Sequence, residues 1–277
     1  MKEMTREEHA SEPVPCPVVG IGASAGGLAA FTRLLSQLPE QTGMAYVIVQ
    51  HLDPAHQSLL PDLLARATKM PVREVTDGMT VEPDHVYVSP PAADLTLHEN
   101  TFVLQPLTQT RGQRLTIDHF FTSLAGERKQ LAIGVLLSGT ASDGTRGLQA
   151  IKAKGGMTFA QDAHSASFPQ MPQNAIAAGG VEYIFSPEEI ADALVQLRHG
   201  AFLQEVKMPL SPEEDTQEEE HFASILRLLR TRTGIDFLSY KPATLRRRLD
   251  HRMAMVHYKD GDERHQAITS TPSQSSD

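Results

Sequence analysis

A glycine-rich turn between two apolar runs constrains this chain more than any other feature. The turn reads Gly-Ile-Gly-Ala-Ser-Ala-Gly-Gly over residues 20–27. An apolar run leads into it from residue 17, and residues 28–38 carry apolar side chains at helical spacing. A buried strand, a tight turn and a helix in this order are typical of an α/β unit. We therefore expect the turn to lie at the carboxyl end of a strand.

Two known motifs overlap in this turn, and they predict different functions. Gly22, Ser24 and Gly26 fit the nucleophile elbow G-x-S-x-G, in which the serine attacks the substrate. Gly20, Gly22 and Ala25 fit the dinucleotide fingerprint G-x-G-x-x-A. The free N–H groups of the following helix would stabilise an oxyanion in the first case and a pyrophosphate in the second. A third interpretation is a plain strand-to-helix turn in which Ser24 caps the helix.

Strand and helix patterns alternate through the next 170 residues. Short apolar runs rich in β-branched residues predict further strands, and amphipathic stretches between them predict helices. Residues 77–106 differ, because 86–90 and 95–106 read as short strands with polar turns between them, and Glu99-Asn100 is a good hairpin tip. This stretch predicts an antiparallel β excursion from the parallel sheet. The pattern predicts an α/β fold with a doubly wound, mostly parallel sheet and an antiparallel β-hairpin. The expected strands are 45–50, 72–75, 86–90, 131–137, 157–160 and 181–185, and the expected helices include 59–68, 117–129 and 187–199.

Polar side chains follow several of the predicted strands. Ser24 follows the first strand, His51 the second, Asp143 the strand 131–137 and Asp162 the strand 157–160. In a doubly wound sheet, ligands bind beyond the carboxyl ends of the strands. A hydroxyl, an imidazole and a carboxylate at one edge are the set needed for nucleophilic catalysis. The dinucleotide alternative needs an acidic residue after the second strand, and Asp53 keeps it open.

Structural roles are also open to these residues. An aspartate before a glycine and a helix, as at Asp143, is commonly a turn former or a helix cap. A histidine after a strand is commonly a loop residue. Other histidines compete with His51 as the base: His56, His85, His98, His119 and His164. The convergence of three suitable side chains on one edge is what favours catalysis.

The composition excludes several classes of protein. The formal net charge is −9, which disfavours non-specific binding of nucleic acid. Cys16 is the one cysteine, so neither a disulfide framework nor a thiolate metal site can form within the chain. The charged N-terminus lacks the apolar core of a signal peptide, and no apolar run reaches membrane-spanning length. These features predict a cytoplasmic protein that does not insert into a membrane.

The composition changes near residue 200. An acidic stretch is followed by a helical pattern that ends at a glycine, then by a basic helical stretch, and the last residues are polar. The expected organisation is a flexible leader (1–15), a catalytic domain (16–199), an acidic linker (200–220), a helical segment (221–258) and a disordered tail (259–277).

Four separated stretches resemble one known family. They read VVGIGASAGG, VIVQHLDP, LLSGTASDGTRG and FPQMPQNAIAAGG, and they occur in the order found in the catalytic domain of CheB-type chemotaxis protein-glutamate methylesterases. The resemblance covers residues 16–198. It implies a serine esterase without metal or cofactor, with Ser24, His51 and Asp143 as its triad. The implied substrates are glutamate γ-methyl esters on chemotaxis receptors, and many members also deamidate glutamines.

The oxyanion would be held by backbone N–H groups near Ala25 and Gly26, with one from the Thr140 loop. Two features depart from the family pattern. The family often has methionine where this chain has Thr140. Many members carry a receiver domain before the catalytic domain, whereas about 15 residues precede the first strand here, so we expect that phosphorylation switch to be missing.

The segment 231–256, TRTGIDFLSYKPATLRRRLDHRMAMV, resembles the helical N-terminal domain of CheR-type receptor methyltransferases. No S-adenosylmethionine-binding domain follows it in this sequence. The resemblance implies a shared partner, the chemotaxis receptor, and no methyl transfer by this chain. A catalytically silent receptor-docking module is therefore a further alternative to the esterase.

Overall fold

The computed structural model describes residues 16–51, 58–91, 93–106, 115–200 and 224. The chain divides into two compact units, the first formed by residues 1–36 and 43–187 and the second by 37–42 and 188–277. All the candidate residues of the elbow region lie in the first unit. Among the described residues, no helix is both long and apolar enough to cross a membrane.

Seven parallel strands form the central sheet, in the order β3-β4-β2-β1-β7-β8-β9. The chain fills the β2 side of β1 first and then crosses to β7, so the strand order reverses between β1 and β7. This reversal is the topological switch point at which such sheets bind ligands. The strands are β1 Val18–Ala23, β2 Ala45–Gln50, β3 Val72–Glu74, β4 Val86–Val88, β7 Ala132–Leu136, β8 Met157–Gln161 and β9 Tyr183–Phe185.

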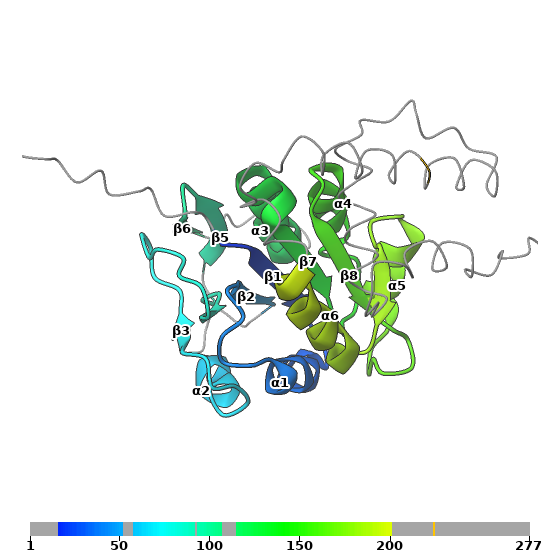
Figure 1. Cartoon of the computed structure of the whole chain (residues 1–277), viewed down its shortest axis with the longest axis horizontal. Helices are drawn as coiled ribbons and strands as arrows, with labels where there is room; N and C mark the ends of the chain where they lie inside the picture. Colours follow the sequence, from blue (N-terminus) through cyan, green and yellow to red (C-terminus); the bar gives the residue numbers. More distant parts are fainter. Residues whose placement is uncertain (1–15, 52–57, 92, 107–114, 201–223, 225–277) are drawn as a thin grey trace, which may run out of the picture. The chain divides into compact units, whose positions relative to one another are not determined.

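The helices of the first unit cover both faces of this sheet. Figure 1 shows α3 and α4 above the sheet and α1 below it. The described helices of this unit are α1 Gly27–Gln37, α2 Leu60–Leu64, α3 Thr116–Arg128, α4 Thr145–Ala153 and α5 Gln170–Ala177, with a 3-10 turn at Lys129–Leu131. Helix α6, Pro187–Gly200, falls in the second unit from Glu188 on. Strands β1, β2 and β7 are almost wholly buried. Burial on both faces explains why they read as continuous apolar runs rather than as alternating ones. The doubly wound parallel fold is confirmed.

Two glycines of β1 allow α3 to lie directly against the sheet. A Cβ atom on Gly20 would stand 2.9 Å from the Phe121 ring, and one on Gly22 would stand 2.5 Å from Ile117 Cγ2. Both contacts are closer than real Cβ atoms show. The G-x-G part of the turn is therefore accounted for by packing against a helix about 100 residues further along the chain.

The antiparallel hairpin is also confirmed. Strands β5 (Ala93–His98) and β6 (Thr101–Pro106) form a two-stranded antiparallel sheet, and Glu99 and Asn100 at its tip have φ of 44° and 65°. Positive φ at both central residues is typical of a tight hairpin turn. The hairpin is fastened to α3 by Ser123, whose hydroxyl accepts the Leu97 N–H and donates to the Phe120 carbonyl.

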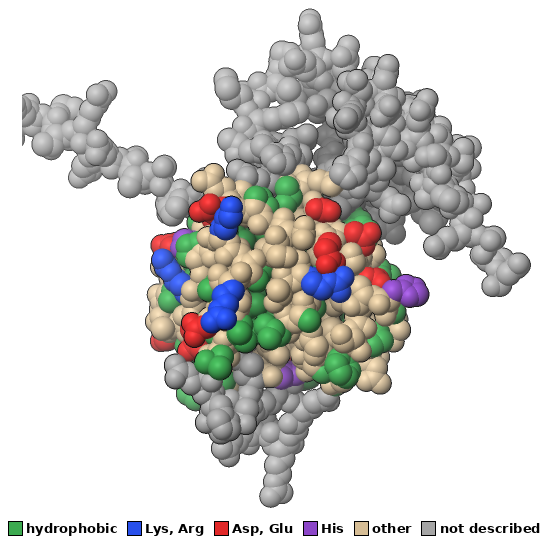
Figure 2. Space-filling model, turned by 90° about the horizontal axis from the view of Figure 1, so that it is seen from below, with side chains coloured by type: hydrophobic (Ala, Val, Ile, Leu, Met, Phe, Trp, Pro, Cys, Tyr) green, Lys and Arg blue, Asp and Glu red, His purple; other side chains and the backbone are tan. Residues whose placement is uncertain are grey.

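Some boundaries differ from those expected. Helix α2 ends at Leu64 rather than near residue 68. The expectation that 86–90 belongs to the antiparallel part is wrong, because β4 pairs in parallel with both β2 and β3 in the main sheet. All three of its side chains are buried there. The acidic linker, the C-terminal helical segment and both tails lie outside the described residues, apart from residue 224. On the face shown in Figure 2, acidic and basic side chains are interspersed, without a broad patch of one sign among the described residues.

Replacement of Gly22 should show how much the α3 packing is worth. Gly22→Ala forces a Cβ against Ile117, and overpacking of this kind costs about 1–3 kcal/mol. The melting temperature should therefore fall by roughly 2–4 °C per kcal/mol. Gly126→Ala is the matched control, since a Cβ at that position of α3 meets nothing within 4 Å. That variant should be neutral or slightly stabilised, and equal effects at the two positions would contradict this packing account.

Candidate active site

The elbow serine lies at the switch point, beside the end of β2. Strands β1 and β2 are paired in parallel up to their last residues, so the next residues are Ser24 and His51. The Ser24 N–H donates to the Ser138 carbonyl at 3.0 Å, and the Ser24 carbonyl accepts the Gly27 N–H at 3.0 Å. The side-chain amide of Gln50 also donates to the Ser24 carbonyl, at 3.4 Å. The backbone of Ser24 is thus held by β2, by the start of α1 and by the end of β7.

His51 and Asp143 are in direct contact, although 92 residues separate them. His51 Nε2 lies 2.7 Å from Asp143 Oδ2. The imidazole is 27% exposed, whereas the carboxylate is 0% exposed. A buried carboxylate on one ring nitrogen selects the tautomer protonated at that nitrogen and leaves the other nitrogen as an acceptor. In this geometry Nδ1 of His51 is the nitrogen left to act as a base.

The Asp143 carboxylate is also fixed by the first turn of α3. Its Oδ2 accepts the Ile117 N–H at 3.0 Å, and its Oδ1 accepts the N–H groups of Asp118 and Gly144 at 2.9 and 2.8 Å. Charge-assisted bonds of this kind are stronger than neutral ones, and the N-terminal end of a helix favours a negative charge. Asp143 therefore has the capping role that the sequence left open, and it contacts the histidine at the same time.

Asp118 is a second buried carboxylate, which the sequence analysis did not single out. It is 8% exposed, and its Oδ1 accepts the Gly147 N–H in the first turn of α4 at 2.7 Å. The loop before α4 thus caps α3 through Asp143, while α3 caps α4 through Asp118. Burial raises the pKa of Asp118 above its usual value. The hydrogen bond from the Gly147 N–H lowers this pKa, and the negative charge of Asp143 raises it further. The sequence signal for this role is an acidic residue in the first turn of a predicted helix. Which N–H group that residue accepts depends on tertiary packing.

The raised pKa of Asp118 predicts a specific dependence of stability on pH. A carboxyl whose pKa is higher in the folded state binds its proton more tightly there, so its contribution to stability is complete below the unfolded pKa. That contribution is lost as the pH rises through the folded pKa. Asp118→Asn keeps an acceptor for Gly147 and does not titrate. Its melting temperature relative to wild type should therefore increase from about pH 4 toward neutrality. If the melting-temperature difference between Asp118→Asn and the wild type stays constant or decreases over this range, the pKa of Asp118 is not raised in the folded state.

The candidate oxyanion donors lie on two loops at this edge. Among the described residues, the backbone N–H groups of Ala25 and Gly26 donate to no protein acceptor, and Gly26 has φ of +75°. Thr140 is exposed, and its N–H likewise has no partner in the described part of the chain. The next residue, Ala141, has φ of 68°, and Asn174 donates to its carbonyl at 2.7 Å. These positions are compatible with the expected oxyanion site.

The competing candidates have other partners. Asp162 accepts hydrogen bonds from Ser165 and from the His164 N–H within its own loop. Although burial opposes ionisation, those hydrogen bonds hold the pKa of Asp162 below its usual value. His119 lies 3.9 Å from Asp94 and His98 lies 3.4 Å from Glu127, on α3 and the hairpin. His56 and Asp53 lie outside the described residues.

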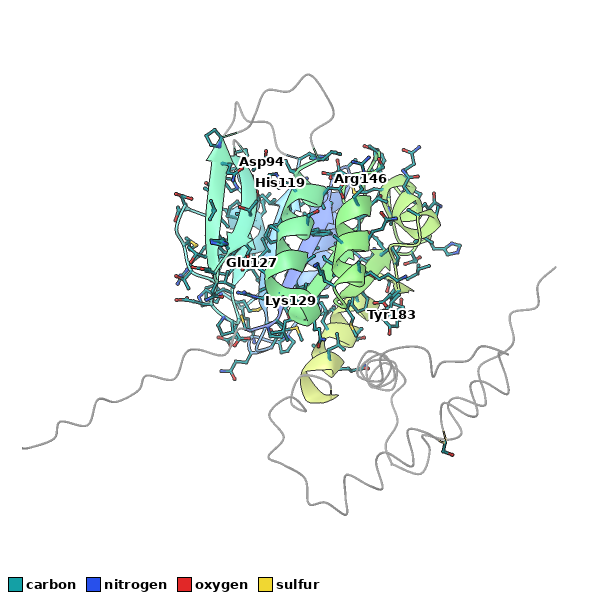
Figure 3. The ribbon with its side chains drawn as sticks, turned by 90° about the horizontal axis from the view of Figure 1, so that it is seen from above. Asp94, His119, Glu127, Lys129, Arg146 and Tyr183 are labelled. Carbon is teal, nitrogen blue, oxygen red and sulfur yellow. The ribbon has the colours of Figure 1, made fainter. Side chains whose placement is uncertain are left out.

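Figure 3 shows how the two capped helices are arranged. His119 and Arg146 mark the N-terminal ends of α3 and α4 at one edge, next to Asp94, whereas Glu127 and Lys129 mark the opposite end of α3. Because both helices begin at the carboxyl edge of the sheet, their first turns can hold Asp143 and Asp118 there. Nowhere in the described ranges do three or more His, Cys, Asp or Glu side chains gather as a metal-binding group would.

The fold and the site define a doubly wound α/β protein with a serine elbow and a carboxylate–histidine pair at the switch point. The family model described as CheB methylesterase matches residues 19–194, and the chain belongs to this family. A second model, the all-alpha domain of CheR methyltransferase, matches residues 220–273. Both family resemblances seen in the sequence are confirmed.

Individual proteins support this assignment. The CheB methylesterase catalytic domain of Thermotoga maritima superposes with a TM-score of 0.62 and 28% identity, over 66% of this chain and all of that one. A Burkholderia thailandensis protein-glutamate methylesterase/protein-glutamine glutaminase is 37% identical over 65% of this chain and 53% of its own length. An uncharacterized 104.1 kDa protein of Rhodobacter capsulatus is 35% identical over 73% of this chain. The chain spans 23% of that protein and about half of the Burkholderia one.

Proposed function

We propose that this chain is a serine esterase that hydrolyses glutamate γ-methyl esters on chemotaxis receptors, with glutamine deamidation as a second reaction. The observation that carries the proposal is the 2.7 Å contact between His51 and the buried Asp143, next to the elbow serine of a CheB-family fold. Ser24 is the proposed nucleophile, His51 the general base, and Asp143 the group that orients His51 and stabilises its charged form.

The proposed reaction is acyl transfer in two steps. The Ser24 hydroxyl attacks the ester carbonyl while His51 Nδ1 takes its proton, and N–H groups of Ala25, Gly26 and the Thr140 loop stabilise the oxyanion. The tetrahedral intermediate then breaks its bond to the methoxy oxygen, which leaves as methanol with the proton from His51. Water, activated by the same base, hydrolyses the acyl-serine and releases the glutamate side chain and a free Ser24.

The two alternatives are less well supported. A dinucleotide site would require the glycines to serve phosphate binding, but Gly20 and Gly22 are accounted for by α3. A docking module that keeps the elbow only as a turn would need Asp143 at most as a helix cap, and would not need its buried carboxylate in contact with His51. Both features favour catalysis.

We assign the catalytic domain to residues 16–199, and we infer that the CheR-like segment contacts the same receptor. The family matches at 19–194 and 220–273 support this division, with the linker between them. The proposed partner is a methyl-accepting receptor and the proposed compartment is the cytoplasm.

The test is a methanol-release assay with the full chain and a methyl-esterified receptor fragment. Release that depends on the enzyme concentration supports the esterase. A titration with NAD(H) in parallel distinguishes the dinucleotide alternative, since saturable micromolar binding without methanol release would favour it. Receptor binding without methanol release would favour the docking module.

A further inference from the structure

Ser138 is a buried residue at the end of β7 that forms hydrogen bonds with the elbow and with the loop that precedes α5. It is 1% exposed. Its N–H donates to Gln161 Oε1 at 2.8 Å, and its carbonyl accepts the Ser24 N–H at 3.0 Å. Its hydroxyl donates to the Ala25 carbonyl at 2.9 Å and accepts the Phe168 N–H at 3.0 Å. Every polar group of this residue is therefore used, and two of the four bonds go to the elbow.

The hydroxyl determines which way the Ala25–Gly26 peptide faces. In a trans peptide the C=O and N–H point in opposite directions, and the described residues contain no cis peptide bond. Because the Ala25 carbonyl points at Ser138, the Gly26 N–H points away from it. A Cβ on Gly26 would lie 2.7 Å from the Ser138 hydroxyl, so this close approach also requires glycine there.

The same bonds select the elbow's available donors. The Ser24 N–H is consumed by the Ser138 carbonyl, and the Gly27 N–H by the Ser24 carbonyl. The N–H groups of Ala25 and Gly26 are the ones without a protein acceptor in the described part of this turn. An oxyanion donor works only when it is held in place before the charge develops. Of the two peptide groups that carry these N–H groups, the Ala25–Gly26 peptide is held by the side-chain hydroxyl of Ser138.

Ser138 also positions an exposed ring beside the elbow. The Phe168 N–H donates to the Ser138 hydroxyl, and the Phe168 carbonyl accepts the Gly139 N–H at 2.9 Å. Its side chain is 44% exposed, and Cδ2 lies 3.2 Å from the position of a Cβ on Gly26. Loss of the hydroxyl would therefore release two neighbouring backbone groups at once, the Ala25 carbonyl and the Phe168 N–H.

We propose that Ser138 is a positioning residue for the esterase reaction, because its hydroxyl holds the Ala25–Gly26 peptide with the Gly26 N–H directed away from β7 and free to donate to the oxyanion. This inference rests on the proposed function. Ser138 is buried, so its side chain is not available to a bound substrate. It acts through the Ala25–Gly26 peptide, so it should affect the transition state more than the bound ester.

The experiment compares Ser138→Ala with Ser138→Thr, which keeps the hydroxyl, and with Ser123→Ala. Ser123 is a matched control, since its hydroxyl also accepts one backbone N–H and donates to one carbonyl, but between β5 and α3. Ser138→Ala should lower kcat for methanol release by about 10- to 100-fold, less than the loss of a whole oxyanion donor, with KM changed much less. Ser138→Thr should recover most of kcat. Ser123→Ala should melt earlier but keep the wild-type kcat.

Labelling by a fluorophosphonate provides a second readout, in which the serine oxygen bonds to phosphorus, fluoride leaves and the proton passes to the base. The labelling rate should fall in Ser138→Ala and not in Ser123→Ala. A wild-type kcat in Ser138→Ala, or an equal loss in both alanine variants, overturns the positioning role. If the wild type is labelled but releases no methanol, the proposed substrate is wrong, and the labelling rates decide on Ser138. If the wild type does neither, both proposals fall.

Discussion

Ser24→Ala should lower the rate of methanol release from methylated receptor by about 10³-fold or more, because removal of a nucleophile leaves only the binding and oxyanion contributions. The fold should be unaffected, since the bonds of Ser24 to its neighbours run through its backbone. Ser36→Ala is the control, as Ser36 is an exposed serine of α1 whose hydroxyl donates to the Arg33 carbonyl one turn earlier. Release that persists in Ser24→Ala would show that another group attacks the ester.

Asp143→Asn should have the other large effect, and it should act on both activity and stability. An amide cannot hold the imidazole in the required tautomer, and the loss for triads of this kind is on the order of 10⁴-fold. Both carboxylate oxygens accept backbone N–H groups, so the amide nitrogen must face a donor in either orientation. An unsatisfied buried donor costs about 1–3 kcal/mol, which should appear as a lower melting temperature.

Asp118→Asn separates the two roles of Asp143, which are the contact with His51 and the capping of a helix. Asp118 is a neighbouring buried carboxylate that accepts the Gly147 N–H, and none of its contacts in the described structure involves a histidine. That variant should keep most of the methanol-release rate. A comparable loss in both variants would mean that the helix caps, rather than the contact with His51, carry the effect of Asp143.

Local sequence patterns were sufficient for the elements that form the elbow. The strand before Ser24, the strand 45–50 and the helix after the turn all occur where their apolar spacing placed them. The rule that carboxyl ends of parallel strands share one edge then indicated that Ser24, His51 and Asp143 converge. The direct contact of His51 with Asp143 bears out that part of the expectation, whereas the catalytic role of the three remains a proposal.

The rest of the site depends on contacts between distant segments, which no local pattern reports. Ser138 reads as one more small polar residue in a glycine-rich loop, and its role appears only when the elbow lies beside it. The role of Asp118 likewise depends on α4 lying beside α3, because the N–H group that it accepts belongs to α4. The G-x-G motif was ambiguous for the same reason, because the packing of Ile117 and Phe121 on Gly22 and Gly20 is invisible in a short window.

Covalent labelling shows directly whether Ser24 is the nucleophile. The full chain is treated with a fluorophosphonate and the adduct is mapped by mass spectrometry of its peptides, with Ser24→Ala treated in the same way. We predict one adduct on the peptide that contains Ser24, formed in the wild type and absent in the variant. An adduct on another residue, or labelling that persists in Ser24→Ala, would show that Ser24 is not the nucleophile.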